Sequence, residues 1–528
     1  MKKLVTLLCF ALMAIVMVSG LFAGGGRETG PAGGNAPNSS NFNRNTLART
    51  RAPADYTITI LTVSHTGDII PNDHPAIRAL EQHTGYNIRL EYILNANYNE
   101  SMNTRLAARD LPGIVVITGN TDPIVLSATY GAFWDITDVY EQYPNLARAN
   151  KDVMNNISIG GRYFGFYRER DVGRAGMVYR SDWLRTVGLG VPRTLDDLYN
   201  VLRAFTNNDP DGNGRADTFG MTWTGAHMVP FHDLAVMHGA PNRFGIQNGR
   251  LVPWFEYPEF IQAMEYSKRL YDEGLINRDF AALPTGEWAL PIGTNRAGWH
   301  MDVADEANRT ANRLLQNGFM TQAEFDAGER VWVMGSVANN RGQIYSRANN
   351  AGHQGYVAIS TTGARTLQDL HYHLDFLDKL NDAFGQDTLN YGAEGINWTR
   401  NADNTLRVIP AAEVQGGWSV VEGLNQFRMF TDRSSAVSPT AYQRRHIEVY
   451  AENLTVIVHD PTTPIASLSP TWTQRASTLN RLIDDAVINF IMGNIDRAGF
   501  NREIQRWYAE DGQRALDELQ AAYARTTR

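Results

Sequence analysis

The chain has 528 residues, of which 43% are hydrophobic, so it is long enough to bury more than one hydrophobic core. Its formal net charge of −8 is too small and of the wrong sign for a nucleic-acid-binding protein. The one cysteine, Cys9, excludes a disulfide framework.

The N-terminus is typical of a secretory signal. Lys2 and Lys3 supply positive charge, residues 4–18 form an apolar run without a charge, and residues 21–23 provide a cleavage site that ends in a small alanine. A signal peptide has an apolar region of about 7–15 residues, shorter than the ~20 residues that span a membrane. We expect residues 1–23 to be removed and the mature protein to be soluble in the periplasm or its equivalent.

Residues 24–55 are rich in Gly, Asn, Pro and Arg and show little periodicity. This composition predicts a flexible tether rather than part of a core. The chain beyond it exceeds what one hydrophobic core usually holds, so at least two domains are expected.

Residues 56–118 alternate between strand and helix patterns. The first helix has Pro75 at its start and Gly85 after its end, and the last strand is continuously apolar and β-branched, as a strand buried on both faces should be. This βαβαβ pattern predicts an α/β fold with a parallel sheet and helices on both of its faces. Strands are predicted at 56–63, around 88–92 and at 114–117, with helices at 75–84 and around 98–106.

The rest of the chain is mixed and then helical. Apolar residues at helical spacing predict helices in the middle and at the C-terminus, and one further apolar run predicts a strand. The helices are expected near 196–205, 258–273, 302–316, 367–377, 479–490, 504–508 and 516–519, and the strand at 356–360.

A loop rich in oxygen ligands follows the helix near 196–205. A calcium loop supplies oxygen ligands from alternating positions one to nine, with Gly at position six. Gly214 occupies this turn position, and position twelve is Gly220, so the usual bidentate Glu is missing. The alternative is that this loop is a solvated acidic turn and binds no ion. We predict a structural Ca²⁺ site whose ligands are Asp209, Asp211, Asn213, the Arg215 carbonyl and Asp217.

Motifs spread over most of the mature chain carry a resemblance to a known family. They are the runs at 179–184 (Tyr-Arg-Ser-Asp-Trp-Leu), 187–189 (Val-Gly-Leu), 191–192 (Val-Pro), 209–214 (Asp-Pro-Asp-Gly-Asn-Gly), 110–112 (Asp-Leu-Pro), 270–275 (Leu-Tyr-Asp-Glu-Gly-Leu) and 391–392 (Tyr-Gly) with Gly395. In order and spacing they resemble the extracellular solute-binding protein family 1, and within it the large binding lipoproteins that serve ABC importers of oligosaccharides.

The resemblance implies an α/β, two-lobe periplasmic binding protein fold of class II type, with discontinuous lobes joined by a hinge. It implies an N-terminal lobe of residues 56–165 and 355–410 and a C-terminal lobe of residues 166–354 and 411–528. The lipoproteins of this family carry a lipidated cysteine directly after the cleavage site, whereas this chain has Gly24 there. We therefore do not expect a lipid anchor.

Two polar loops follow predicted strands and are candidates for ligand binding. In open α/β sheets, ligands bind beyond the carboxyl ends of the strands. The loop at 64–68 contains His65, and the loop at 118–122 contains Asn120 and Asp122. These residues are expected to bind sugar hydroxyls. The alternative is that the loops are polar only because they lie at the surface.

Aromatic and basic residues near loops are the other candidates. A tryptophan ring can stack on the apolar face of a sugar, which favours Trp223, Trp299 and Trp398, although large rings near loops more often pack than bind. Tyr167 and Arg168 precede an expected crossing between lobes. Arg168 could hold a carboxylate if the ligand is acidic.

The sequence has no His-Glu-x-x-His, no paired Cys, no phosphate-binding Gly loop that ends in Lys-Ser or Lys-Thr, and no Gly-x-Ser-x-Gly. His371 and His373 lie on different faces of a predicted helix, which makes a metal site there improbable. The resemblance implies a monomeric, non-enzymatic receptor of an ABC importer, which binds an oligosaccharide and delivers it to the permease subunits. A secreted glycan-active enzyme braced by calcium, or a ligand sensor for a receptor kinase, is the alternative. The sequence leaves open whether the ligand is a neutral sugar, a uronate fragment or a peptide.

Overall fold

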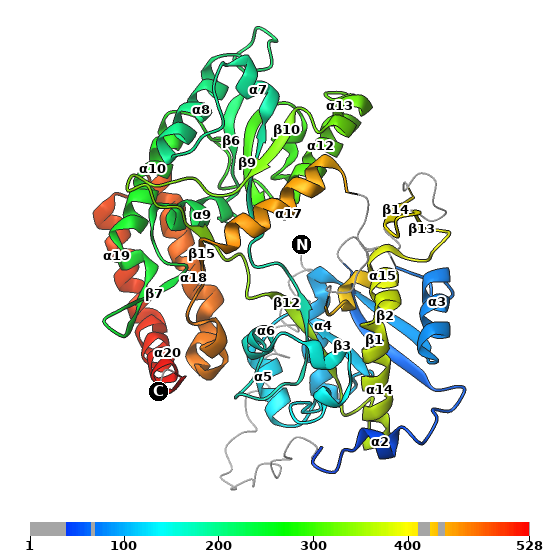
Figure 1. The fold of residues 1–528 in the computed structure, drawn as a ribbon. Helices are drawn as coiled ribbons and strands as arrows, with labels where there is room; N and C mark the ends of the chain where they lie inside the picture. Colours follow the sequence, from blue (N-terminus) through cyan, green and yellow to red (C-terminus); the bar gives the residue numbers. More distant parts are fainter. Residues whose placement is uncertain (1–38, 65–68, 227, 410–422, 431–438, 527–528) are drawn as a thin grey trace, which may run out of the picture. The chain divides into compact units, whose positions relative to one another are not determined.

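The computed structural model describes residues 39–64, 69–226, 228–409, 423–430 and 439–526 (Figure 1). The expected signal segment 1–23 and the candidate ligand residue His65 lie outside the described residues.

The first sheet has five strands in the order β2-β1-β3-β12-β4. Strand β1 pairs in parallel with β2 and with β3, which confirms the predicted parallel βαβαβ unit. Strand β12 runs antiparallel to both of its neighbours, β3 and β4. The strands are β1 (Thr57–Ser64), β2 (Asn87–Leu94), β3 (Ile114–Ile117), β4 (Gly165–Glu169) and β12 (His353–Ile359).

Helices of this part form two groups. Helix α3 (Pro75–Thr84) packs against α14 (Leu367–Leu380) and α15 (Ala383–Tyr391), whereas α4 (Asn95–Ala108) packs against α5 (Asp122–Thr129). Helix α3 ends as predicted, because Gly85 adopts a left-handed conformation with φ of 79° that costs glycine little.

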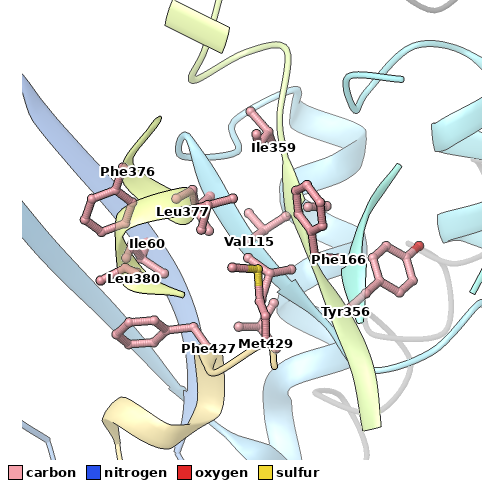
Figure 2. Packing of buried hydrophobic residues seen from close by; sticks show 14 of the residues in the cluster. Ile60, Val115, Phe166, Tyr356, Ile359, Phe376, Leu377, Leu380, Phe427 and Met429 are labelled. Atoms are coloured by element: carbon pink, nitrogen blue, oxygen red, sulfur yellow. The ribbon is translucent and has the colours of Figure 1, made fainter. Parts of the chain in front are cut away.

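The core of the first sheet is formed by side chains from its strands, from helix α14 and from a segment much later in the chain. Figure 2 shows Ile60 of β1 and Val115 of β3 packed with Leu377 of α14, and with Phe427 and Met429. The backbone N–H of Glu169 donates to the carbonyl of Met429 over 2.8 Å. Residues 424–430, with η6 (Leu424–Phe427), and strand β4 therefore pack with the first sheet, although the sequence-based division assigns both stretches to the other lobe.

The prediction of a flexible tether is wrong for residues 39–55. Phe42 is buried in the first core with its ring 6.3 Å from that of Tyr143, and the backbone N–H of Arg44 donates to the side chain of Gln142 over 3.0 Å. Asn43 caps the short helix α2 (Arg44–Leu47). One buried aromatic ring and a cap hold this segment, and polar composition alone does not reveal them.

The second sheet has four strands in the order β10-β5-β9-β6. Strand β5 is antiparallel to β10 and β9, and β6 is parallel to β9. The strands are β5 (Ala175–Arg180), β6 (Phe219–Thr222), β9 (Ala297–Val303) and β10 (Val331–Met334). A core of its own, built from residues within 177–337 and 465–522, surrounds this sheet.

The predicted helices of the middle and C-terminal regions are present. Thr194 and Asp197 form a capping box at the start of α8, as its Thr-x-x-Asp pattern favours. Helix α12 begins later than expected, because residues 302–303 still belong to β9. They are α8 (Leu195–Asn207), α10 (Pro258–Asp272), α12 (Glu306–Gln316), α18 (Pro470–Ile491), α19 (Arg497–Trp507) and α20 (Gln513–Thr526). The structure adds α17 (Ala441–Leu454), which was not predicted.

Candidate functional site

Two adjoining cavities lie beyond the carboxyl end of β3. The first, of about 250 Å³, is lined by Asn120 and Tyr356 from the first sheet's part and by Trp472 at the start of α18. The second, of about 380 Å³, is lined by Arg243, Asn349 and Asp460, among others. Asn156 and Thr463 line both cavities. We call these two cavities together the groove.

Three buried polar atoms of the groove have no hydrogen-bond partner among the described residues. They are Oδ1 of Asn120, Oδ1 of Asn349 and the hydroxyl of Tyr356. The Asn120 amide is oriented by its Nδ2, which donates to the carbonyl of Ile157 over 3.3 Å. A buried polar atom without a partner costs about 1–3 kcal/mol, so three of them in one place make the groove a candidate binding site.

Trp472 gives the groove an aromatic side. Ser469 caps the first turn of α18 by accepting from the backbone N–H of Trp472 over 3.0 Å, and its own hydroxyl donates to Glu518 over 2.8 Å. The ring of Trp472 packs edge-on against Phe244, with 5.2 Å between centroids. These contacts fix the indole in one orientation, as a surface that positions a sugar ring requires.

The charged residues of the groove include both donors and acceptors. Arg347 donates to Asp233 over 2.6 Å, whereas the Arg243 guanidinium makes no hydrogen bond or ion pair with another described residue. Burial raises the pKa of Asp460 to about 6, despite hydrogen bonds from Thr462 that favour its charged form. An arginine that lacks a partner and a nearby carboxylate together match the mixed donors and acceptors of sugar hydroxyls.

The strand-end residues Asn120 and Asp122 differ in their positions, because Asn120 alone of the two is among the residues that line the groove. Asp122 occupies the first turn of α5 and accepts a hydrogen bond from the Gln474 side chain on α18 over 3.3 Å. Asn120 lines the groove.

Tyr167 and Arg168 lie inside the protein instead. The Tyr167 hydroxyl accepts from the backbone N–H of Asn150 over 3.0 Å. Arg168 is buried and donates to the Gln354 carbonyl over 2.8 Å and to Oε1 of Gln426 over 2.7 Å. In this structure both residues hold the protein's own segments together.

The three tryptophans expected at the ligand are instead core residues. Trp223 and Trp299 are 0% exposed and Trp398 is 1% exposed. Trp299 stacks on Tyr179 with 5.0 Å between ring centroids, and Nε1 of Trp398 donates to the Gly392 carbonyl over 3.0 Å. No ring face is open to a sugar, because neighbouring side chains fill the space that a ligand would need.

The acidic loop is folded around Asn213. Its Nδ2 donates to Asp211 over 2.9 Å and to Asp217 over 3.1 Å, and the backbone N–H of Gly214 donates to Asp209 over 2.9 Å. The Asn213 Oδ1 in turn accepts from the backbone N–H of Arg215 over 2.8 Å.

As the loop stands, amide groups occupy the space between its carboxylates. Within the described residues, no three His, Cys, Asp or Glu side chains are arranged to hold a metal ion. The pKa of Asp211 is raised, first by burial and then by the neighbouring Asp209 and Asp217. Three carboxylates are thus held close together, and a cation would relieve their repulsion.

Sequence reasoning missed several groove residues. His353 and Tyr356 lie on β12, which runs antiparallel to β3 and so brings its amino end to this edge of the sheet. A rule based on the carboxyl ends of strands cannot find them. Asn349, Arg243 and Trp472 come from distant segments that only the tertiary fold brings together.

None of the helices in the described part of the chain is long and apolar enough to cross a membrane.

Comparisons with known proteins identify relatives over most of the chain. Residues 73–287 match the family described as bacterial extracellular solute-binding protein. Lipoprotein LipO of Bacillus subtilis (strain 168) is 33% identical over 463 residues, which cover 86% of this chain and 89% of LipO. The polygalacturonan/rhamnogalacturonan-binding protein YtcQ of the same organism is 28% identical, covering 86% of this chain and 88% of YtcQ.

Solved structures share the fold at lower identity. The substrate-binding protein FusA of the Streptococcus pneumoniae ABC transporter, in complex with kestose, matches with a TM-score of 0.68 and 17% identity, over 89% of this chain and 99% of FusA. The alginate-binding protein AlgQ2 without calcium ion matches with a TM-score of 0.67 and 18% identity, over 89% of this chain and 98% of AlgQ2. These matches show the α/β, two-lobe fold of solute-binding proteins. Because the chain is 33% identical to LipO over 86% of its own length, it belongs to the bacterial extracellular solute-binding protein family.

Proposed function

We propose that this protein is the extracytoplasmic receptor of an ABC importer and binds an oligosaccharide in the groove. The observation that carries the proposal is the set of three buried polar atoms without partners, Asn120 Oδ1, Asn349 Oδ1 and the Tyr356 hydroxyl, next to the fixed ring of Trp472. Kestose and polygalacturonan, which the similar proteins FusA and YtcQ bind, support a sugar.

The groove is bridged by hydrogen bonds that a hinge motion would make and break. Gln474 donates to Asp122 over 3.3 Å, and the Ser467 hydroxyl donates to the Ser158 carbonyl over 3.1 Å. Each bond joins a residue of the first sheet's part to the segment of residues 467–474. We propose that the two parts form lobes that close around the ligand by a hinge motion and present the closed form to the permease subunits.

The proposed site of action is outside the cytoplasmic membrane, in agreement with the expected signal segment, and the proposed receptor acts as a monomer. Its role is binding without chemical change. Incubation with oligosaccharides should leave them intact. Turnover that is lost on substitution of a carboxylate would instead establish the alternative of a glycan-active enzyme.

A direct test is isothermal titration of the purified protein with a panel of neutral and acidic oligosaccharides and peptides. A micromolar affinity, about −8 kcal/mol, is usual for a transport receptor. Binding of sugars but not of peptides, weakened by Trp472→Ala, supports the proposal. Binding of peptides alone would contradict it.

We further propose that the loop of residues 209–217 binds a structural Ca²⁺ ion. Asp211 and Asp217 already accept from the side-chain amide of Asn213, and Asp209 accepts from the backbone N–H groups of Asn213 and Gly214. Rotation of this amide would direct its oxygen, which calcium prefers, into the same space. The similarity to AlgQ2, whose structure was solved without its calcium ion, agrees with this proposal. The ion would brace the second sheet's part and not contact the sugar.

A further inference from the structure

His353 lines the groove at the amino end of β12, and its two ring nitrogens have different surroundings. Nδ1 accepts a hydrogen bond from the backbone N–H of Gly355 over 3.1 Å. Nε2 makes no hydrogen bond or ion pair with another residue in the described part of the chain. Because Nδ1 offers its lone pair to this N–H, the proton of the neutral ring lies on Nε2. His353 therefore has one free N–H donor, on the ring nitrogen farther from its own backbone.

A β-bulge holds His353 in this position. The pairing register of β12 with β4 shifts between His353 and Tyr356, and Gly355 has φ of 78°. A Cβ atom at Gly355 would overlap the carbonyl oxygen of Ile117, so only glycine allows this close approach of β12 to β3. Bulges re-aim side chains beside functional sites. Here the bond from Gly355 to the imidazole also fixes the ring.

Burial keeps the imidazole of His353 neutral. It lowers the pKa of the ring to about 4, because the charged form loses its hydration. A second proton, on Nδ1, would also point at the N–H of Gly355. The ring is therefore an uncharged donor at neutral pH, which suits an uncharged partner such as a hydroxyl oxygen.

Asn120 offers the complementary acceptor at the same edge of the sheet. Tyr356 of β12 pairs with Ile117 of β3 in antiparallel register. His353 lies three residues before Tyr356 and Asn120 three residues after Ile117, so both reach the same end of this strand pair. Both line the same cavity of about 250 Å³. Because Nδ2 of Asn120 already donates to the carbonyl of Ile157, its buried Oδ1 is the atom left to accept.

Adjacent hydroxyl groups of a sugar ring match this donor and acceptor. One hydroxyl can donate to Oδ1 of Asn120 while the other accepts from Nε2 of His353. Trp472 lines the same cavity and offers a ring face for the sugar. An O-methyl or O-acetyl group has no hydrogen to donate and needs more space. The pair therefore distinguishes free hydroxyl groups from substituted ones.

We infer that His353 is a specificity-determining residue of the groove, and that together with Asn120 it selects a sugar unit whose hydroxyl groups are free. This inference rests on the proposed sugar-binding function. It adds which side chain donates to the sugar and which chemical form of the sugar is accepted, whatever the net charge of the oligosaccharide.

Substitutions at His353 separate the roles of its two nitrogens. His353→Gln places an amide N–H near the position of Nε2, whereas the shorter side chain of His353→Asn reaches only the position of Nδ1. Asparagine can still accept from the backbone N–H two residues on, so it keeps the bulge. His74 provides the matched control as His74→Asn. Its Nδ1 accepts from the backbone N–H of Ala76 over 3.2 Å in the same way, but it is not among the residues that line the groove.

Isothermal titration with kestose, trigalacturonate and mannotriose, and with the fully O-methylated form of each, measures the affinities. For each trisaccharide that binds the wild type, His353→Asn should weaken binding about tenfold and His353→Gln at most about threefold. His74→Asn should leave the affinity unchanged, and the O-methylated sugars should not bind. The melting temperature of ligand-free His353→Asn should equal that of the wild type.

Nitrogen NMR of the imidazole rings at neutral pH gives a second measurement, which does not depend on any variant being functional. The signals of His353, identified by their loss in His353→Asn, should show the Nε2–H tautomer in the ligand-free protein. The Nε2 signal should shift on addition of a trisaccharide that binds, whereas the signals of His74 should not.

Several outcomes would overturn the inference. An unchanged affinity in His353→Asn would remove the role of His353 and leave the proposed function standing. Equal losses of affinity in His353→Asn and His353→Gln would assign the residue to the bulge instead of to a donor. An Nδ1–H tautomer would contradict the assigned donor, and undiminished binding of the O-methylated sugars would contradict the selection of free hydroxyl groups. If none of the trisaccharides binds the wild type, the proposed function fails, and the inference fails with it.

Discussion

The side-chain amide of Gln474 donates a hydrogen bond to the carboxylate of Asp122 over 3.3 Å. Gln474 lies on α18 and Asp122 in the first turn of α5, so this one bond joins a C-terminal helix to the helix that follows β3. The negative carboxylate also suits the N-terminal end of α5.

If this bond forms mainly when the lobes are closed, its loss should weaken ligand binding slightly. Because an exposed hydrogen bond contributes about 0.5–1 kcal/mol, Gln474→Ala should lower sugar affinity about two- to fivefold. Isothermal titration measures the affinity, and small-angle scattering should show a smaller compaction on ligand addition. Gln474→Glu, which places a second carboxylate beside Asp122, should weaken binding further. Equal affinities in all three proteins would show that this bond does not contribute to closure.

Tyr356→Phe separates ligand binding from stability. The Tyr356 hydroxyl is buried and has no partner among the described residues, so its removal should leave the ligand-free protein as stable as the wild type or more stable by about 1 kcal/mol. Sugar affinity should fall about five- to tenfold, because a bound hydroxyl loses its partner. Chemical denaturation and titration on the same preparations measure the two effects. A loss of stability without a loss of affinity would count against the groove.

Trp299→Ala tests the placement of this ring in the core. The side chain is 0% exposed and stacks on Tyr179, and truncation of such a residue costs about 3–5 kcal/mol of unfolding free energy. The folded fraction should keep its sugar affinity, in contrast to Trp472→Ala. A loss of sugar affinity without a loss of unfolding free energy would instead show that Trp299 contacts the ligand.

The proposed calcium site predicts a stability change on chelation. Removal of calcium should lower the melting temperature, and added calcium, but not added magnesium, should restore it, because magnesium demands a more rigid octahedral site. Asp211→Asn should reduce this difference strongly, since Asp211 is the most crowded carboxylate of the loop. An exposed acid elsewhere, Asp485 on α18, provides the matched control as Asp485→Asn. Identical melting with chelator and with calcium would exclude the site.

Asp460 should make the protein less stable as the pH rises. Burial raises its pKa to about 6 from an ordinary value of 3.8, so the folded state holds the protonated form more tightly than the unfolded chain does. The contribution is therefore fully present below about pH 4 and is lost as the pH rises through 6, with a total of about 3 kcal/mol.

Asp460→Asn should reduce the loss of stability between pH 4 and pH 7, as measured by urea denaturation at each pH. Part of the loss should remain, because burial also raises the pKa of Asp302 to about 6. An unchanged pH profile in the variant would show that Asp460 is ionised in the folded protein at little cost.

Local patterns were sufficient for much of the fold. The continuous apolar run at 114–117 predicted a strand buried on both faces, and Pro75 and Gly85 predicted the limits of α3, all of which the structure confirms. These features depend on near neighbours in the chain. The position of Asn120 at the edge of the sheet was predicted in the same way, because the strand before it is parallel to β1, and the groove lies at that edge.

The burial of large side chains was not predictable in the same way. Trp398 lies near a glycine turn, which suggested exposure, but its indole donates to the Gly392 carbonyl and is enclosed. Phe42 lies in a polar segment, which suggested flexibility, but its ring fills a place beside Tyr143. In both cases the burial of the ring depends on contacts in the folded protein, which the spacing of residues along the chain does not reveal.

The sequence by itself determined the α/β class, the first parallel strands, the main helices and the polar loop after β3, because hydrophobic period, caps and turn residues act over a few residues. Only the tertiary structure decided which residues share the groove. Tyr356, Trp472 and Arg243 reach it through an antiparallel strand and through segments that are far apart in the chain. Their positions follow from the pairing and packing of distant elements, which depend on the free energy of the whole chain.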